Sequence, residues 1–352
     1  MRKRILTGIT TTGTPHIGNY LGAIKPALEL VAPDNDSFFF LADYHALIKQ
    51  NDPKEITGSV KNVALAWLSS GLDPEQSYFY RQSDIPEVQE LAWILNCSAS
   101  KGLLNRAHAY KAIVAENTLS GSDEDKGINM GLFSYPVLMA ADILIFNATH
   151  VPVGPDQAQH MEMTRDIAGK FNHTYSNILT LPEALIQNEI SVPGNDGRKM
   201  SKSYNNIIPF LSSEKALQKS IAKIVTNSLE PGEPKDCETC TLFNLYSFFA
   251  TADEIKDMKQ SYKDGISWGE VKKSLFNAIN DEILPIREKY TELKDQPDLL
   301  NDLFSDGAQK VRPQAQELIG KLREAVGISN ICLLYTSPSP RDATLSRMPS
   351  SA

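Results

Sequence analysis

Cysteine is scarce in this sequence: four in 352 residues are too few for a disulfide-stabilised scaffold, and they suit a reducing compartment. There is also no apolar run near the roughly 18 residues that a membrane-spanning helix needs. Charged residues at positions 2–4 lead directly into an apolar stretch, so we expect no cleavable signal. The net charge of −8 leaves any nucleic-acid contact to a local basic patch or to shape. These absences favour a cytoplasmic protein without a membrane span.

Metal-binding patterns are equally scarce. Cys237 and Cys240 have the spacing of zinc ligands, but no second cysteine or histidine pair stands near them. Two cysteines also cannot supply the four thiolates of a common iron–sulfur cluster. We therefore expect neither a structural zinc site nor an iron–sulfur cluster, and the role of the pair stays open.

Apolar runs and helical patterns alternate along the first part of the chain. Short apolar runs predict strands at 4–6, 37–42, 78–81 and 151–154, with helical spacing between them. This order predicts an α/β domain with a doubly wound parallel sheet over residues 1–203. From about Ser212 the pattern is helical, which predicts an α-helical domain over 204–328 that residues 299–326 complete as a bundle. Residues 329–352, dense in Ser and Pro, are expected to be a disordered or non-native tail.

A glycine- and threonine-rich turn joins the first strand to a helix that begins near Ile17. A helix N-terminus favours an anion, and His16 stands there as a donor for a phosphate oxygen. Gly18 leaves the flank of the helix bare, so a flat group such as a base can lie against it. By itself, this segment is equally compatible with an ordinary strand–helix turn and a surface histidine.

A second segment, residues 197–203, places two lysines three positions apart in a Gly/Ser loop. Lys199 and Lys202 can form a mobile cationic clamp, and Met200 can pack into the body of the protein and hold the loop. Such a loop, taken alone, is more often only a solvated surface segment.

A third segment, residues 135–146, carries a carboxylate within an apolar helical run. Met139 and Asp142 are three positions apart and share a face, and Tyr135 can point into the same pocket. A buried carboxylate is costly unless it meets a donor, and an indole N–H is a donor without acceptor capacity. The alternative is that a neighbouring backbone N–H satisfies Asp142.

Polar residues also follow two of the predicted strands, where open α/β sheets bind ligands. Asp43 and His45 come after the strand at 37–42, although a helix-capping Asp43 is an alternative. Asp156 and Gln157 open a helix after the strand at 151–154, where Asp156 can simply be a cap. His160, one turn further along, is expected on the helix surface.

Together these segments resemble the paired signatures of class I aminoacyl-tRNA synthetases: a HIGH-type element at 16–19 and a KMSKS loop at 199–203. The Met-Ala-Ala-Asp run at 139–142 resembles the tryptophanyl-tRNA synthetases, whereas tyrosyl enzymes carry a different pattern. The resemblance covers residues 4 to about 328. Asn19 stands where a second histidine is common, residues 10–12 where a Gln-Pro-Ser type run is common, and Leu6 where an aromatic side chain often lines the indole pocket.

The resemblance implies a Rossmann-like, HUP-type fold and ATP-dependent ligation of L-tryptophan to tRNA(Trp) through an adenylate, with Mg²⁺ accompanying ATP, in a cytoplasmic homodimer. It implies that the helical domain binds the tRNA anticodon. The implied catalytic residues are His16, Lys199 and Lys202. The implied ATP-binding residues are Thr10, Thr11, Thr12, Gly18, Asn19, Asp156, Lys199, Met200, Ser201 and Lys202, with Lys111 near the phosphates. The implied tryptophan-binding residues are Leu6, Asp43, His45, Tyr135, Met139, Asp142 and Gln157. The resemblance also implies that Gln157 orients the ammonium of the amino acid together with Tyr135.

Three alternatives remain. A tyrosine-specific relative is disfavoured by the Met139 and Asp142 pair. A small nucleotidyltransferase shares the His-x-Gly turn but lacks the second lysine loop and the long helical region. A paralogue that binds tRNA or nucleotide without catalysis would be expected to have lost Lys199 or Lys202, and both are present.

Overall fold

The centre of the molecule is a sheet of five parallel strands in the order β3-β2-β1-β4-β5. The computed structural model describes residues 2–186 and 190–329. The strands are β1 (Lys3–Thr10), β2 (Asn35–Ala42), β3 (Tyr78–Arg81), β4 (His150–Val153) and β5 (Glu183–Ile186). The predicted doubly wound parallel sheet is confirmed. β5 was not predicted, because its four residues form no distinctive apolar run.

The strand order changes direction at β1, and this change creates the crevice where a ligand can bind. β1 pairs with β2 along its length, from Lys3 opposite Asn35 to Thr10 opposite Ala42. On its other side β1 pairs with β4 near Ile5. The loops that follow β1 and β4 therefore leave the sheet in different directions, which opens a crevice at their carboxyl ends.

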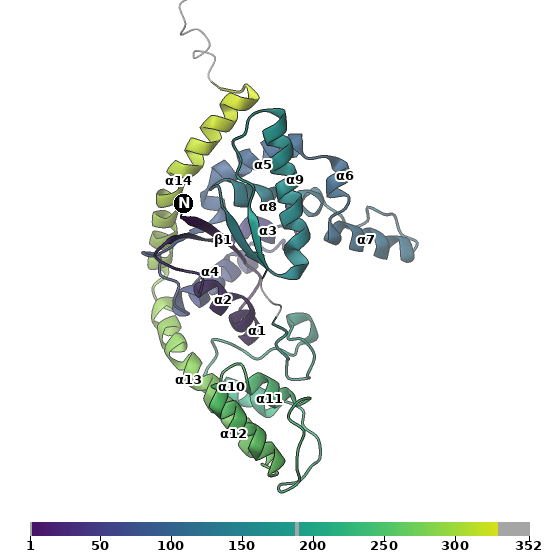
Figure 1. The fold of residues 1–352 in the computed structure, drawn as a ribbon, viewed down its shortest axis with the longest axis vertical. Coiled ribbons are helices and arrows are strands. Elements are labelled where there is room, and N and C mark those ends of the chain that lie inside the picture. Colours follow the sequence, from purple (N-terminus) through teal and green to yellow (C-terminus); the bar gives the residue numbers. More distant parts are fainter. Residues whose placement is uncertain (1, 187–189, 330–352) are drawn as a thin grey trace, which may run out of the picture.

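Helices cover both faces of the sheet (Figure 1). Phe39 of β2 points into one core with α4 (Pro53–Ser69) and α13 (Trp268–Lys294). Its neighbours Phe38 and Phe40 point into the other core with α5 (Pro86–Ser98), α8 (Met130–Leu144) and α9 (Ala158–Thr174). A strand buried on both faces explains why β2 appears as a continuous apolar run in the sequence.

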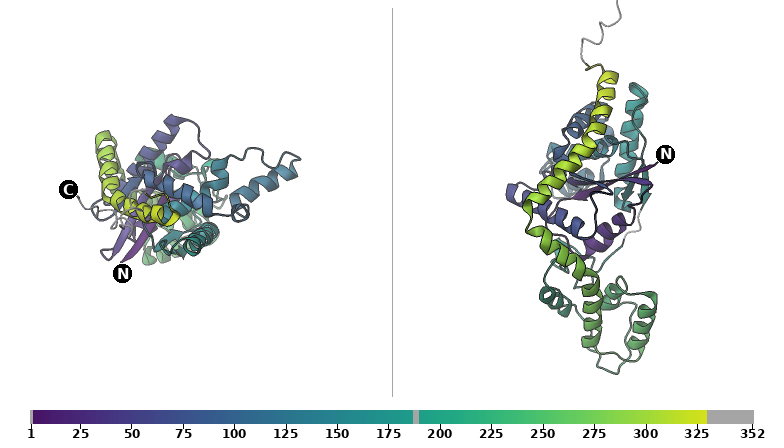
Figure 2. Two further views of the ribbon diagram at one scale, coloured as in Figure 1. Left: turned by 90° about the horizontal axis from the view of Figure 1, so that it is seen from above. Right: turned by 90° about the vertical axis from the view of Figure 1, so that its left-hand side faces the viewer.

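The C-terminal helices do not form one separate bundle. The short helices α10 (Glu214–Ala222), α11 (Thr241–Tyr246) and α12 (Ala252–Lys263) gather with the first half of α13 at one end of the molecule (Figure 1). The last helix, α14 (Pro297–Val326), instead runs back along the sheet, as both views in Figure 2 show. The prediction that residues 299–326 complete a helical bundle is therefore wrong, because α14 packs mainly against β3 and α5.

Specific contacts hold α14 against β3 and α5. The ring of Phe304 lies 5.6 Å from that of Phe79. A side chain at Gly307 would overlap the carbonyl oxygen of Phe79, so glycine permits the close approach of the helix. Arg312 also pairs with Glu87 of α5 at 2.9 Å.

Two short helices, α6 (Lys101–Leu104) and α7 (His108–Leu119), follow α5. α7 has no buried side chain and projects away from the body (Figures 1 and 2). The predicted tail lies, apart from Ser329, outside the described residues.

Candidate active site

Two adjoining cavities open at the carboxyl ends of the strands, and both are lined by Gly8 and Thr10 of β1. We call the first the Asp142 cavity; its polar lining includes His45, Tyr135, Asp142 and Gln157, and Leu6 and Met139 contribute apolar wall. We call the second the Lys202 cavity; its lining includes Thr12, His16, Gly18, Asn19, Lys199, Met200, Ser201 and Lys202. The turn that carries His16, the lysine loop at 197–203 and the helix that carries Asp142 therefore meet at one crevice.

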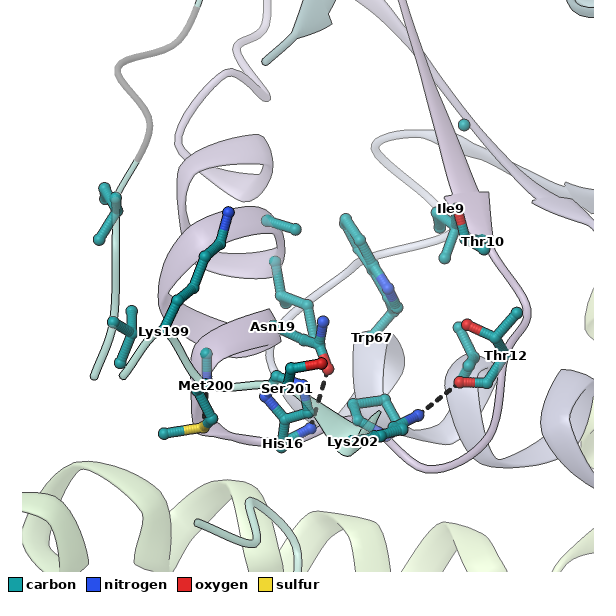
Figure 3. Close-up of a pocket in the computed structure, with 18 residues that line it drawn as sticks. Ile9, Thr10, Thr12, His16, Asn19, Trp67, Lys199, Met200, Ser201 and Lys202 are labelled. Atoms are coloured by element: carbon teal, nitrogen blue, oxygen red, sulfur yellow. Dashed lines mark hydrogen bonds between the residues drawn. The ribbon is translucent and has the colours of Figure 1, made fainter. Parts of the chain in front are cut away.

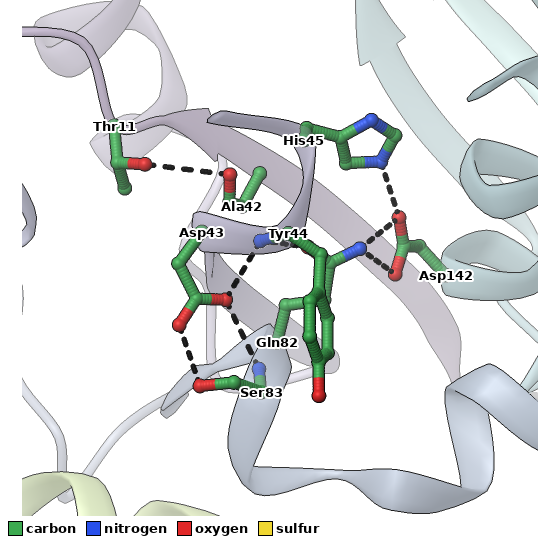
Figure 4. A network of polar contacts seen from close by, with 8 residues as sticks. All are labelled: Thr11, Ala42, Asp43, Tyr44, His45, Gln82, Ser83 and Asp142. Atoms are coloured by element: carbon green, nitrogen blue, oxygen red, sulfur yellow. Dashed lines mark hydrogen bonds and ion pairs between the residues drawn. The ribbon is translucent and has the colours of Figure 1, made fainter. Parts of the chain in front are cut away.

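Asp142 is almost fully buried, yet its carboxylate is well supplied with donors (Figure 4). Nε2 of Gln82 donates to both carboxylate oxygens, at 2.7 and 2.9 Å. Nε2 of His45 lies 2.9 Å from Oδ2. Burial raises the pKa of Asp142, while the hydrogen bonds from His45 and Gln82 act in the opposite direction. A carboxylate has about four lone-pair sites, so one remains for a ligand in the cavity.

Gln82 is a residue that sequence reasoning missed. It begins the 3₁₀ turn η2 (Gln82–Asp84) directly after β3 and is completely buried. Its Oε1 accepts from the backbone N–H of Tyr44 at 3.1 Å, which fixes its amide nitrogen toward Asp142. The rule that drew attention to Asp43, a polar residue after an apolar strand, would have found Gln82 as well.

Asp43 lines neither cavity. It begins the short helix α3 (Asp43–Ala46), and its carboxylate accepts from the backbone N–H and hydroxyl of Ser83, at 3.0 and 2.5 Å (Figure 4). It also accepts from the N–H of Tyr44 at 3.1 Å. Asp43 thus joins α3 to η2. It neither lines a cavity nor caps α3, whose N-cap is Ala42.

His160 lies inside the protein, so the expected surface position is wrong. Only 5% of it is exposed, because this face of α9 packs against α8. The Tyr135 hydroxyl lies 2.6 Å from Nε2 of His160, and Oε1 of Gln157 lies 3.1 Å from Nδ1. Burial lowers the pKa of His160. Helical periodicity did not reveal this contact, because it depends on which side of α9 meets its neighbour.

The Asp142 cavity suits one elongated ligand. Its volume of ≈ 360 Å³ is near the small end of the range for ligand pockets, roughly 300–1,000 Å³. Tyr135 and Asp142 lie on the same helix, α8, about 10 Å apart along its axis. Polar groups therefore stand at two separated points, with apolar wall between them.

His16 stands at the start of α1 (Ile17–Asn19), which continues into the π-helical turn η1 (Tyr20–Ile24). Oδ1 of Asn19 accepts from the backbone N–H of His16 at 3.1 Å. Burial, reinforced by the charge of Lys202, lowers the pKa of His16 to about 4. The imidazole is therefore neutral at pH 7, with one N–H to donate. Within the described residues its Nδ1 has no hydrogen-bond partner.

The lysine loop is anchored to this helix by Met200, as its sequence suggested. Met200 is 6% exposed, and its sulfur lies 3.4 Å from the backbone nitrogen of Gly18. A Cβ at position 18 would lie 3.1 Å from the His16 ring, so the glycine permits this packing. The flank of Gly18 is therefore covered by Met200 and not bare. Nζ of Lys202 donates to the carbonyl oxygen of Thr12 at 2.6 Å (Figure 3).

Asn206 organises the same loop and was not anticipated. It is 1% exposed, and its Oδ1 accepts from the backbone N–H of Ser201 at 2.7 Å. Its Nδ2 donates to the Lys199 carbonyl at 3.1 Å and to Asp196 Oδ1 at 2.7 Å. Glycine at 194 leaves the space that the Asn206 side chain fills.

Three other predicted residues lie outside the two cavities. The Thr11 hydroxyl is buried and donates to the Ala42 carbonyl at 3.3 Å. Asp156 is exposed in the turn η3 (Pro155–Gln157) and lies beside the Gln157 amide. Lys111 is exposed on the projecting helix α7.

The described part of the chain contains no helix that is long and apolar enough to cross a membrane. The same residues contain no group of three or more His, Cys, Asp or Glu side chains that could hold a metal ion.

The comparisons with known proteins agree on one family. A family model for class I tRNA synthetases (W and Y) matches residues 2–283. The tryptophan–tRNA ligase of Neisseria meningitidis is 54% identical over 330 residues, which is 93% of this chain and 98% of that protein. The crystal structure of tryptophanyl-tRNA synthetase from Campylobacter jejuni, complexed with ADP and tryptophan, has a TM-score of 0.84 and 44% identity, over 92% of this chain and 99% of that one. A tyrosyl-tRNA synthetase from Aeropyrum pernix has a TM-score of 0.62, over 87% of this chain and 90% of that one, but is only 17% identical, so it shares the fold alone.

Proposed function

This chain belongs to the class I tRNA synthetases for tryptophan and tyrosine, and on that premise we propose that the Asp142 and Lys202 cavities form its catalytic centre. Its function is the ATP-dependent ligation of L-tryptophan to tRNA(Trp) through a tryptophanyl-adenylate. In the proposed arrangement the amino acid occupies the Asp142 cavity and ATP occupies the Lys202 cavity. Gly8 and Thr10, which line both, lie where the two substrates meet.

The observation that carries this assignment is a buried carboxylate with spare acceptor capacity in an apolar cavity. Gln82 and His45 hold Asp142 in place and leave it acceptor capacity for one further donor in the cavity. The indole N–H of tryptophan is a donor that accepts nothing, so it suits this group. Phenylalanine offers no donor here and would leave the acceptor unpaired.

Activation needs no nucleophile from the protein, because the tryptophan carboxylate attacks the α-phosphate of ATP and pyrophosphate leaves. Catalysis then depends on positioning and on stabilising charge. The neutral His16 donates its single N–H to a phosphate oxygen at the start of α1. Lys199 and Lys202 stabilise the departing pyrophosphate, and Lys202 exchanges the Thr12 carbonyl for a phosphate oxygen.

Mg²⁺ is proposed to enter with ATP. Magnesium keeps several waters and is commonly held by substrate phosphates with only one or two protein carboxylates. A site of this kind needs no cluster of acidic residues, and the lysine-rich lining of the Lys202 cavity suits a nucleotide that brings its own cation.

The remaining surfaces suggest how the enzyme meets its partners. We assign binding of the tRNA anticodon to the α10–α12 module and the first half of α13. A homodimer would cover large apolar side chains that α5, α7 and α8 leave in solvent: Trp93 is 71% exposed, Leu119 90% and Met130 73%. Because ATP and tRNA are its substrates, we place the enzyme in the cytoplasm.

The direct test is amino-acid-dependent ATP–pyrophosphate exchange with each of the twenty amino acids, followed by charging of tRNA(Trp). We expect tryptophan alone to support rapid exchange, and EDTA to abolish it. Exchange with tyrosine at a comparable rate would contradict the assignment of the Asp142 cavity. Sedimentation of the purified protein tests the homodimer.

A further inference from the structure

His160 lies behind the Asp142 cavity, and both nitrogens of its ring have partners. Nε2 is 2.6 Å from the Tyr135 hydroxyl, and Nδ1 is 3.1 Å from Oε1 of Gln157. Tyr135 and Gln157 line the cavity, whereas His160 does not. The ring can therefore influence a ligand only through these two side chains.

The proton positions on His160 and Tyr135 follow from the contact between Gln157 and Asp156. The Asp156 carboxylate can only accept, so the Gln157 atom 3.1 Å from it is the amide nitrogen. Oε1 of Gln157 then faces His160, and because a carbonyl oxygen cannot donate, Nδ1 of His160 carries the proton. Nε2 is consequently a bare acceptor, and Tyr135 donates its hydroxyl proton to it.

This arrangement makes the cavity side of both residues an acceptor surface. The Tyr135 hydroxyl has committed its only proton to His160, so its oxygen lone pairs are all that remains for a ligand. Oε1 of Gln157 likewise has a second lone pair. Two oxygens that can only accept match an ammonium group, which has three donors and no acceptor.

We propose that His160 is a positioning residue, which keeps the Tyr135 hydroxyl and the Gln157 carbonyl as acceptors for the α-ammonium of tryptophan. This inference rests on the proposed function, since it places the amino acid in the Asp142 cavity. An apolar side chain at position 160 would free the hydroxyl proton of Tyr135 to turn into the cavity, where it would oppose the ammonium.

Protonation of His160 would have a similar effect, because both ring nitrogens would then donate. Burial lowers the pKa of His160, the charges of His108 and His45 act in the same direction, and Asp156 opposes them. The neutral ring therefore predominates at pH 7, and acid weakens tryptophan binding as the ring takes up a proton.

The test compares His160→Phe with His160→Gln in tryptophan-dependent ATP–pyrophosphate exchange. Phenylalanine keeps a ring of similar size without an acceptor, whereas glutamine supplies an amide oxygen that can accept from Tyr135. We expect His160→Phe to raise KM for tryptophan by about 10- to 100-fold with kcat changed less than about threefold. His160→Gln should recover part of this loss.

A ligand without the amino group separates positioning from a structural role. 3-(Indol-3-yl)propionate, used as a competitive inhibitor, should bind wild type and His160→Phe equally. Equal weakening of both ligands would overturn the proposal, as would an unchanged KM for tryptophan. If His160→Phe does not fold, His160→Met takes its place against His160→Gln with the same two ligands, and the same selective loss for tryptophan is required of the methionine variant.

The same assays distinguish failure of the proposed function from failure of the proposed role of His160. Wild-type protein without tryptophan-dependent exchange would contradict the proposed function itself. An active wild type combined with no selective loss in the variants would contradict only the role of His160. In the Tyr135→Phe background, adding His160→Phe should raise KM less than it does in the wild-type background, because only the contact through Gln157 is then lost.

Discussion

The two cavities of the crevice are constructed differently. In the Asp142 cavity, interlocked side chains come from regular elements: Gln82 bridges Tyr44 and Asp142, and His45 adds a third contact. In the Lys202 cavity, a loop carries the cations and is held by a few contacts, chiefly those of Met200 and Asn206. The first arrangement suits recognition of one fixed shape, and the second suits a group that changes its charge and position during the reaction.

This difference indicates which substitutions should affect binding of tryptophan and which should affect the turnover rate. A rigid network with satisfied hydrogen bonds contributes equally before and during the reaction, so its loss appears in KM and in discrimination. A cationic loop contributes most when charge develops on the leaving pyrophosphate, so its loss appears in kcat.

The largest effect is expected for the lysines. Lys199→Ala or Lys202→Ala should lower the exchange kcat by about 10²-fold or more, while KM for tryptophan changes little. Steady-state exchange kinetics measure both constants. Lys215→Ala, which removes an exposed lysine from α10, is the matched control and should leave both unchanged. Equal turnover in the Lys202 variant and wild type would remove the distinction between the two cavities.

The next largest effect is expected for a substitution at Asp142, and it should appear in the preference for tryptophan over phenylalanine. Asp142→Asn keeps the size of the side chain but weakens the acceptor that faces the cavity. We expect the ratio of kcat/KM for tryptophan to that for phenylalanine to fall about 30-fold. An unchanged ratio would mean that another group reads the indole. Asp142→Ala is less informative, because the buried amide of Gln82 would lose its partner at a cost of about 1–3 kcal/mol in stability.

A substitution at Asn206 tests whether the loop of the Lys202 cavity acts independently of the Asp142 cavity. Asn206→Ala removes the side chain that accepts from Ser201 and donates to the Lys199 carbonyl. Without these hydrogen bonds the backbone that carries Lys199 and Lys202 is held less firmly. The exchange kcat should therefore fall about tenfold. KM for tryptophan serves as the internal control. A parallel rise in that KM would show that the two cavities are not independent.

The smallest effect concerns acid stability. The pKa of His16 falls from 6.5 in the unfolded chain to about 4 in the folded protein, so the unfolded chain binds the proton more strongly. Stability should therefore be lost as pH falls below 6.5, by about 1 kcal/mol at pH 6. Urea unfolding at pH 7.5 and 6 measures this difference. His16→Asn should reduce the loss, and an identical loss would show that the imidazole titrates normally.

The strands were largely predictable, because burial on both faces leaves uninterrupted apolar runs such as that of β2. The paired motifs at 16–19 and 199–203 also identified the Lys202 cavity, since each carries its own chemistry. The path of α14 was not predictable in this way. Its apolar stripe, which includes Phe304, would suit a helical bundle as well as the sheet on which it lies.

The residues behind the Asp142 cavity were harder to predict than those that line it. Asp142, Tyr135 and Met139 share a helix face, so their spacing brought them together. The contacts of His160 depend on how α8 and α9 pack, and no local pattern specifies that packing. Gln82 follows β3 directly, so the strand-end rule could have found it, but not its contact with Asp142. Asp43 illustrates the converse error, since a polar residue at a strand end can equally bind a neighbouring loop.

The position of α14 has a consequence for how the protein is made. Synthesis proceeds from the N-terminus, so β3 and α5 leave the ribosome long before the helix that covers them. Until Phe304 and Gly307 emerge, β3 at the edge of the sheet lacks the contacts that these residues of α14 make with Phe79. This part of the fold is therefore completed only after residues 297–326 have been translated. The nascent sheet must remain without this cover until then, a period in which chaperones can bind it.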